Sequence, residues 1–283
     1  MSVIRLFSDR RKSRTVFVLG GGGNLGAVQV GMLRAVIERG VVPDLLLGAS
    51  VGALNAAAIA ADPSIDGVKA LDTAWRAIDG DDLMPGHLSG LWQLARKSRS
   101  VHHNDGLRRL IDRAIPFTTF EDAPVPFQVV ATSLRTGRER WFGTGRIVEP
   151  ILASAALPGV FPPVDIDGEL FIDGGVVDNV PMTRAANLGA TRMYVFHVGN
   201  FDRPRPDPKR PIDVLLQAFS ISRNYRFLAE VQDPPEGVEL ICLPAVDPGS
   251  LRRNDFARSA LLIDRAYATA SAFLDQHTSA LSG

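Results

Sequence analysis

A single serine stands between two glycines at the point where a short apolar run gives way to an alanine-rich stretch. The run is Leu45–Leu47, the turn is Gly48-Ala49-Ser50-Val51-Gly52, and the alanines continue to Ala61. A strand can turn into a helix within so few residues only if the corners lack side chains, because a Cβ there would collide with the neighbouring strand or helix. The pattern predicts a strand, a tight turn and a helix. Ser50 would then lie at the helix N-terminus, where backbone N–H groups stabilise developing negative charge.

Two other interpretations of this segment compete with a nucleophilic serine. A transmembrane helix over Leu45–Ala61 is disfavoured, because the stretch is shorter than the roughly 20 residues that a bilayer core requires and is rich in alanine. An ordinary buried helix whose serine has no chemical role stays open on this motif alone.

The size and composition of the chain favour one large domain. Its 283 residues, 46% of them hydrophobic, suffice for an α/β domain with a substantial core. We expect this domain to span residues 15–283, after a basic arm over residues 1–14 that is either frayed or in contact with a membrane surface or partner. Lysine plus arginine and aspartate plus glutamate number 31 each, so no general attraction for nucleic acid is expected.

Strands and helices alternate at the start of the predicted domain. A β-branched strand at Thr15–Leu19, a helix at Leu25–Arg39 and a strand at Leu45–Leu47 indicate a parallel sheet with helical crossovers. Further helices are expected at Gly67–Ile78, Leu88–Lys97, Gly106–Ile115, Ile147–Ala156, Ile212–Val231 and Asp255–Gln276. Further strands are expected at Phe127–Leu134 and Glu139–Phe142, as a hairpin, and at Leu170–Ile172, Met193–Val198 and Val238–Leu243. The helical insertion over residues 62–114 is either a wall over the site or a plain structural layer.

A run of four glycines, Gly20–Gly23, follows the first strand and opens the first helix. Its backbone N–H groups are unobstructed by side chains, so the turn is suited to holding an anion, such as the oxyanion of an acyl-transfer reaction. The run also fits the dinucleotide-binding pattern Gly-x-Gly-x-x-Gly. That alternative is disfavoured, because it needs an acidic residue at the end of the second strand, and Asp44 precedes that strand. No Gly-Lys-Ser/Thr follows, which excludes a P-loop.

The base that would activate Ser50 is harder to identify. The five histidines are His87, His102, His103, His197 and His277. None has the late loop position that catalytic triads favour, and His197 lies in a strand pattern that favours a core role. Asp173 is the better candidate, because it follows an apolar strand and precedes two glycines. A simple turn aspartate is the competing interpretation, since Asp-Gly is a strong turn signal.

Taken together, these motifs resemble those of the patatin-like phospholipase family. The matching segments are Gly21-Gly22-Gly23-Asn24-Leu25-Gly26, Gly48-Ala49-Ser50-Val51-Gly52 and Asp173-Gly174-Gly175, in that order, with Ser154–Pro163 shortly before the aspartate. The resemblance covers about residues 15–200. It implies a three-layer α/β/α fold with a mainly parallel central sheet.

The resemblance further implies a lipid acyl hydrolase with a Ser-Asp dyad. Ser50 would attack a fatty-acyl ester carbonyl, Asp173 would accept its proton, and an acyl-enzyme would form, without a metal or cofactor. The oxyanion would be held by backbone N–H groups among Gly21, Gly22, Gly23 and Asn24. Many members carry Arg or Lys where this chain has Leu25, so a phospholipid preference does not follow. A lipid-binding protein of the same fold that turns over little is the alternative.

The expected surroundings are a reducing cytoplasm. The start of the chain lacks the apolar run of a signal peptide, and the one cysteine, Cys242, falls in an apolar strand pattern that predicts a buried thiol. We expect a lipid ester as the substrate, with a peripheral contact at the inner face of the membrane left open. The sequence carries no signal for an oligomeric state.

Overall fold

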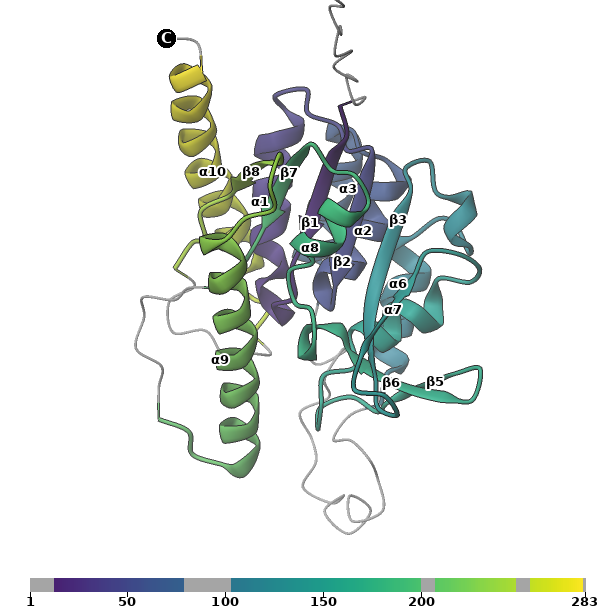
Figure 1. Ribbon diagram of the computed structural model, residues 1–283. Helices are drawn as coiled ribbons and strands as arrows, with labels where there is room; N and C mark the ends of the chain where they lie inside the picture. Colours follow the sequence, from purple (N-terminus) through teal and green to yellow (C-terminus); the bar gives the residue numbers. More distant parts are fainter. Residues whose placement is uncertain (1–12, 79–102, 200–206, 248–254, 282–283) are drawn as a thin grey trace, which may run out of the picture.

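The computed structural model describes residues 13–78, 103–199, 207–247 and 255–281. A single mixed sheet lies at its centre, flanked by helices (Figure 1). The strands are β1 (Thr15–Leu19), β2 (Leu45–Ala49), β3 (Phe127–Ser133), β4 (Glu139–Phe142), β5 (Val164–Ile166), β6 (Glu169–Asp173), β7 (Arg192–Phe196) and β8 (Glu239–Cys242). Five strands run parallel and are neighbours in the order β3, β2, β1, β7 and β8. Strands β4 and β6 each pair antiparallel with β3, and β5 pairs antiparallel with β6.

Strand β3 carries two different partners along one of its edges. Its first residues pair with β2, ending with Val130 opposite Ala49, and its last residues pair with β6, beginning with Ala131 opposite Asp173. Strand β4 overlaps both of these stretches, so it must occupy the other edge of β3. Strands β2 and β6 therefore meet end to end. This register brings the carboxyl end of β6 next to the residue that follows β2.

Helices cover both faces of the sheet. They are α1 (Gly26–Ile37), α2 (Val51–Ala61), α3 (Ile65–Arg76), α6 (Asp105–Ala114), α7 (Val148–Ser154), α8 (Met182–Asn187), α9 (Pro211–Gln232) and α10 (Ser259–Leu281), with short 3₁₀ turns η1 (Gly23–Leu25), η2 (Phe120–Asp122) and η3 (Gly174–Val176). Alternate side chains of β1 point to opposite faces: Phe17 and Leu19 join a large core with α1, α2, α3, α6, α7 and α10, whereas Val16 and Val18 join a smaller core with α8 and α9. The expected three-layer α/β/α architecture is confirmed.

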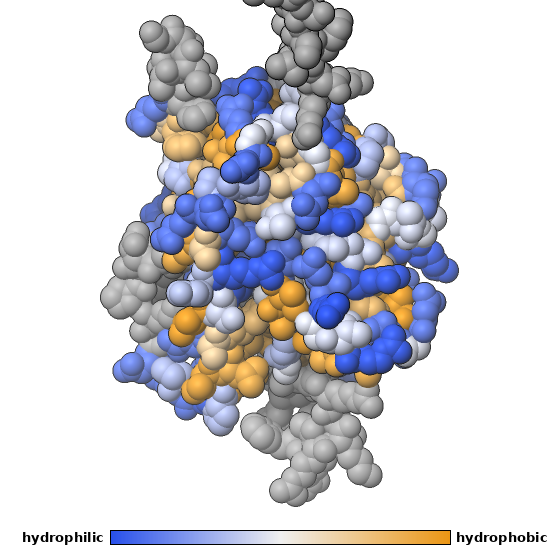
Figure 2. Space-filling view, in the orientation of Figure 1, coloured by the Kyte–Doolittle hydropathy of each residue, from blue (hydrophilic) through white to orange (hydrophobic). Residues whose placement is uncertain are grey.

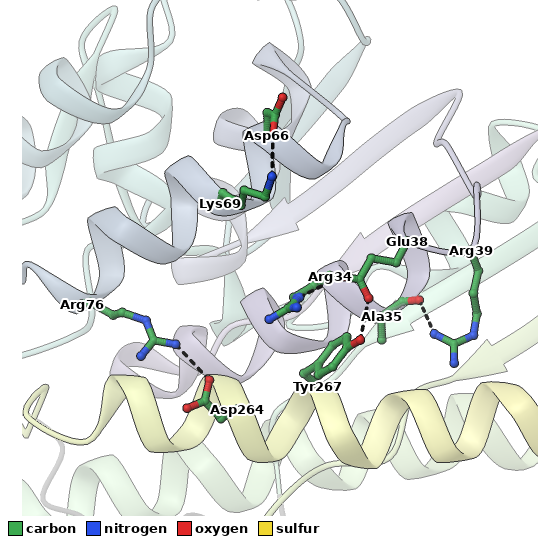
Figure 3. A network of polar contacts seen from close by, with 9 residues as sticks. All are labelled: Arg34, Ala35, Glu38, Arg39, Asp66, Lys69, Arg76, Asp264 and Tyr267. Atoms are coloured by element: carbon green, nitrogen blue, oxygen red, sulfur yellow. Dashed lines mark hydrogen bonds and ion pairs between the residues drawn. The ribbon is translucent and has the colours of Figure 1, made fainter.

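The contact between α1 and α10 is close and apolar at its centre. A Cβ on Gly31 would lie 2.2 Å from the carbonyl oxygen of Ile263, so the two helices approach within backbone contact there. Polar contacts lie around this centre: Tyr267 donates to Glu38 at 2.6 Å, and Arg76 of the neighbouring α3 pairs with Asp264 (Figure 3). Arg39 pairs with Asp275. Packing thus fixes this flank, and the charges surround it.

Most expected elements are present, with shifted ends. The first helix begins at Gly26 because Leu25 belongs to the 3₁₀ turn before it, and the last helix begins at Ser259, four residues later than expected. Strand β5 is an addition. The thiol of Cys242 is only half-buried, although burial raises its pKa to about 11.

Several predictions fall outside the described residues: most of the basic arm, the helix at Leu88–Lys97, and part of the insertion over residues 62–114. Arg14, assigned to the arm, is already tied to the domain, since its backbone N–H donates to Thr191 Oγ1 at 2.8 Å. No helix in the described ranges has both the length and the apolar character needed to cross a membrane.

Candidate active site

Ser50 lies at the tight turn between β2 and α2. Its φ of 54° and ψ of −127° form a positive-φ conformation that residues other than glycine rarely adopt. Glycines make room for the turn: a Cβ on Gly52 would lie 2.1 Å from the carbonyl oxygen of Leu19, and one on Gly48 would lie 2.5 Å from that of Gly52. The N–H of Ser50 donates to the buried hydroxyl of Ser154 at 2.9 Å. The predicted strand, turn and helix are confirmed.

Ser50 and Asp173 are directly hydrogen-bonded. Ser50 Oγ donates to Asp173 Oδ2 at 2.7 Å, and Asp173 Oδ1 accepts the N–H of Gly175 at 2.7 Å. The backbone of Asp173 is fixed as well, because its N–H donates to Ala156 at 3.0 Å and its carbonyl oxygen accepts from Thr132 Oγ1 at 2.9 Å. Asp173 is therefore both a turn aspartate, as the competing interpretation held, and the partner of Ser50.

The environment of Asp173 makes it a stronger base than an exposed aspartate. Its side chain is buried, with 2% of the residue exposed, and this burial raises the pKa to about 6. Hydrogen bonds from Ser50 and Gly175, and the positive charge of Arg223, act in the opposite direction and limit the rise. The carboxylate is thus ionised at neutral pH and able to accept a proton from a neighbouring hydroxyl.

The glycine run lies against Ser50. A Cβ on Gly21 would lie 2.9 Å from Ser50 Cβ and 2.5 Å from Asn179 Oδ1. The N–H of Gly21 donates to the carbonyl oxygen of Asn179 at 3.2 Å, and Asn179 Nδ2 donates back to Gly21 at 3.4 Å. The N–H of Gly21, one of the predicted oxyanion donors, is thus engaged within the protein, so Gly21 is the weakest of the four candidates.

The next two amides differ from that of Gly21. The N–H groups of Gly22 and Gly23 donate to no acceptor in the described part of the chain, and they stand at the start of η1, before α1. Gly23 has a φ of 62°, which glycine adopts without strain. Asn24 is buried, and its Nδ2 donates to the carbonyl oxygen of Asp255 at 3.0 Å. The arrangement keeps Gly22 and Gly23 as oxyanion candidates, with Asn24 beside them.

A chain of buried side-chain hydrogen bonds links the glycine run to the neighbouring helices. Gln29 Nε2 donates to the carbonyl oxygens of Gly20 at 2.7 Å and Phe196 at 2.9 Å. Asn55 Nδ2 donates to Gln29 Oε1 at 2.8 Å, and Trp75 Nε1 donates to Asn55 Oδ1 at 2.9 Å. These bonds join α1, α2 and α3 to the loop that carries the oxyanion candidates.

Sequence reasoning missed these supporting residues: Gln29, Asn55, Thr132, Ser154 and Asn179. A signal was available for some of them. Gln29 and Asn55 are single amides within otherwise apolar helices, and a buried amide needs hydrogen-bond partners. Asn179, by contrast, follows Asp178 in a bend before Pro181, where an asparagine is unremarkable.

His197 has the core role that its sequence context favours. It follows β7 directly, instead of lying within the strand, and its ring stacks on Phe227 with centroids 4.0 Å apart. Burial, with a contribution from the charge of Arg223, lowers its pKa to about 3, so it is neutral at physiological pH. Of the other histidines, His103 is exposed, His87 and His102 lie outside the described residues, and His277 belongs to α10.

Two further residues within or near the predicted motifs have clear positions. Leu25 packs against the large core, so it supplies no charge where many patatin-like sequences have a cation. Asp178 is buried close to Asp173 in the chain, pairs with Arg226 at 3.8 Å, and has its pKa raised by burial to about 7. Among the described side chains, no group of three or more His, Cys, Asp or Glu is placed to hold a metal ion.

Comparison with known proteins gives consistent matches. The family model described as patatin-like phospholipase matches residues 17–186. Lysophospholipase NTE1 of Mycosarcoma maydis is 31% identical over 195 residues, which are 67% of this chain and 10% of the relative. Patatin-like phospholipase domain-containing protein 7 of Mus musculus is 31% identical over 187 residues, 65% of this chain and 14% of the relative. This chain thus corresponds to a small part of those much longer proteins.

Among solved structures, VipD from Legionella pneumophila aligns with 94% of this chain and 67% of its own length. The sequence identity is 16% and the TM-score is 0.48.

Proposed function

Because this chain belongs to the patatin-like phospholipase family, we propose that it hydrolyses fatty-acyl esters of lipids with Ser50 as the nucleophile and Asp173 as the base. The observation that carries the proposal is the 2.7 Å hydrogen bond from Ser50 Oγ to the buried carboxylate of Asp173. A serine hydroxyl becomes an effective nucleophile when an adjacent base accepts its proton, and a carboxylate with a pKa of about 6 is suited to that task.

The proposed reaction has two halves. Ser50 Oγ attacks the ester carbonyl while Asp173 Oδ2 takes its proton, and the N–H groups of Gly22, Gly23 and Asn24 hold the negative oxygen that forms. Asp173 returns the proton to the departing alcohol, which leaves an acyl group on Ser50. Water then attacks this acyl-enzyme with Asp173 again as the base, and the fatty acid is released.

Lysophospholipids, phospholipids and related lipids form the proposed substrate class. The names of the aligned relatives support lysophospholipids in particular. Leu25 offers no cation to an anionic head group, but Arg223 brings a positive charge close enough to lower the pKa of Asp173. We propose that Arg223 takes over part of the electrostatic role of the missing cation.

A fluorophosphonate probe tests the proposed chemistry, since it reacts covalently with activated serines. Intact-mass analysis should show one probe per wild-type chain, and labelling should be lost in Ser50→Ala and in Asp173→Asn. Asp178→Asn is the matched control, because Asp178 is equally buried and also has a raised pKa. It should still be labelled. A folded wild-type protein that takes up no probe would instead favour the lipid-binding alternative.

A further inference from the structure

The outer face of α9 is apolar along most of its length. Between residues 211 and 229 its exposed positions recur at helical spacing, and none of them is charged. They are Pro211, Val214, Leu215, Ala218, Ile221, Ser222, Tyr225, Leu228 and Ala229. Half or more of the surface of Val214, Leu215, Ile221 and Tyr225 is exposed. Figure 2 shows hydrophobic residues gathered at the lower left, where the lower half of α9 lies in Figure 1.

The opposite side of α9 packs against the domain. The outer face is therefore apolar in addition to the side that forms the core contacts. Leu216 and Phe227 are buried, and Phe227 stacks on His197. Arg226 donates to the carbonyl oxygen of Val177 and pairs with Asp178. A continuous exposed apolar surface indicates a binding face, because its contact with water costs free energy that a bound partner would recover.

Helix α9 lies beside the turn that follows Asp173 of the proposed dyad, because Arg226 on its inner side donates to the carbonyl oxygen of Val177. Val176 ends the 3₁₀ turn that begins directly after Asp173, and it is itself 38% exposed. At the start of α9, Ile212 lies against Gly159, in the loop that leads from α7 toward Asp173: a Cβ on Gly159 would be 3.0 Å from Ile212 Cδ1. In Figure 1 the lower half of α9 extends past the carboxyl ends of the parallel strands, the end at which Ser50 follows β2.

We propose that the outer face of α9 docks on the surface of a lipid aggregate and holds the dyad next to its ester substrate. The proposal rests on the proposed function, because a fatty-acyl ester resides in such an aggregate. The chemistry of the face fits this partner: aliphatic side chains enter the acyl region, and Tyr225 places an amphipathic ring at the boundary with the head groups. Four of the charged residues beside the face pair with one another, Arg210 with Asp213 and Arg226 with Glu230. Docking is therefore expected to depend on apolar contact and little on salt.

Flotation with phosphatidylcholine vesicles tests the docking, using the full chain with Ser50→Ala so that no lipid is consumed. Leu215→Glu with Ile221→Glu should lower the bound fraction at least tenfold, because both residues are more than half exposed and neither belongs to a hydrophobic core. Val42→Glu is the matched control: Val42 is 54% exposed, against 52% for Leu215 and 53% for Ile221, and it lies before β2, at the opposite end of the sheet. The Val42→Glu variant should bind vesicles within twofold of the parent protein. Raising the salt concentration should leave the binding of the parent unchanged.

Two further readouts separate the docking from the chemistry. With Ser50 restored, the double variant should hydrolyse a water-soluble short-chain ester like wild type and lose at least tenfold on vesicle-borne lipid. If wild type binds vesicles but cleaves neither ester, the proposed function fails while the docking stands. Equal vesicle binding by the double variant and the parent overturns the docking. So does a wild-type dimer, measured by sedimentation, that the double variant splits while neither binds vesicles, because a second copy would then be the occupant.

Discussion

Two regions of the molecule differ in where their polar groups lie. One is the contact between α1 and α10, and the other is the carboxyl edge of the sheet. Where α1 meets α10, apolar packing forms the centre, and polar contacts lie around it, including the ion pair between Arg76 of the neighbouring α3 and Asp264 of α10 (Figure 3). At the carboxyl edge, the carboxylate of Asp173 and the amide of Asn179 are buried, and Ser50 adopts a positive φ.

The difference indicates that the helix contact contributes mainly to stability, whereas the carboxyl edge is arranged for the proposed chemistry. Surface ion pairs contribute little, and close packing holds helices together without them. Buried charge and backbone strain lower the stability of a fold, and they persist where the surrounding structure enforces them for function. Four substitutions test whether the two regions differ as this comparison requires.

Asp173→Asn should have the largest effect. Loss of the base should lower kcat/KM on a lipid ester by about 10²–10⁴-fold. In wild type, kcat/KM should decrease as the pH is lowered through about 6, because the protonated carboxyl of Asp173 cannot accept the proton of Ser50. A pH–rate profile that stays flat from pH 8 to pH 5 would contradict the assignment of Asp173 as the base.

The same variant should be more stable than wild type at neutral pH. Folding raises the pKa of Asp173 from its ordinary value of 3.8 to about 6, so the folded state binds the proton more tightly and loses stability as the pH rises between these values. Removing the buried charge should restore up to about 3 kcal/mol at pH 7.5, and the gain should shrink toward pH 4. Urea unfolding at both pH values measures the difference.

Gly31→Val should affect the helix contact without affecting the chemistry. A side chain at Gly31 would push against the backbone of Ile263, which should destabilise the protein by about 1–3 kcal/mol. The kcat/KM of the folded fraction should stay within about twofold of wild type. Ala268→Val, on the exposed side of α10, is the control and should cost well under 1 kcal/mol. A large loss of activity in folded Gly31→Val would mean that the two regions are not separate.

Asn179→Ala should lower activity more than its effect on stability explains. Asn179 holds Gly21 through its backbone oxygen and its side chain, and without the side chain the glycine run is less well positioned. We expect a 10- to 100-fold drop in kcat/KM and a loss of about 1–2 kcal/mol in unfolding free energy. Asn187→Ala, at the exposed end of α8, should change neither quantity. Wild-type kinetics in Asn179→Ala would remove the side chain from the positioning role.

Asp264→Ala should have the smallest effect. It removes the pair with Arg76 on the surface beside α10, where 64% of the Asp264 side chain is exposed. The unfolding free energy should change by less than about 0.5 kcal/mol, and kcat/KM should not change. A thermal melt at low and high salt checks this, and a loss above about 1 kcal/mol would contradict the small contribution expected of the surface pairs.

Local patterns in the sequence predicted the elements well. The strand at Thr15–Leu19 and the second strand of the hairpin at Glu139–Phe142 agree with the structure at both ends, because short β-branched or aromatic runs bounded by turn residues have few alternatives. Strand β5 escaped prediction because it has three residues and follows two prolines.

The residues of the candidate site could be proposed from the sequence, but their geometry could not. Glycines around Ser50 and after Asp173 signal close approach, but the sequence contains no information on register. It is the meeting of β2 and β6 on one edge of β3 that joins these two residues. The same limit explains Gly21: its type fits an oxyanion donor, and only the fold shows that Asn179 engages its N–H.

The meeting of β2 and β6 also determines when activity can arise during folding. The bond between Ser50 and Asp173 joins residues 123 positions apart, and the bond between Asn179 and Gly21 spans 158. Contacts between such distant parts of a chain form slowly, because ordering the intervening loop comes first. A nascent chain that has emerged only as far as β4 already contains Ser50 but lacks Asp173, its proposed base. With the proposed dyad, the return of esterase activity during refolding should therefore follow the pairing of β6 with β3 beside β2.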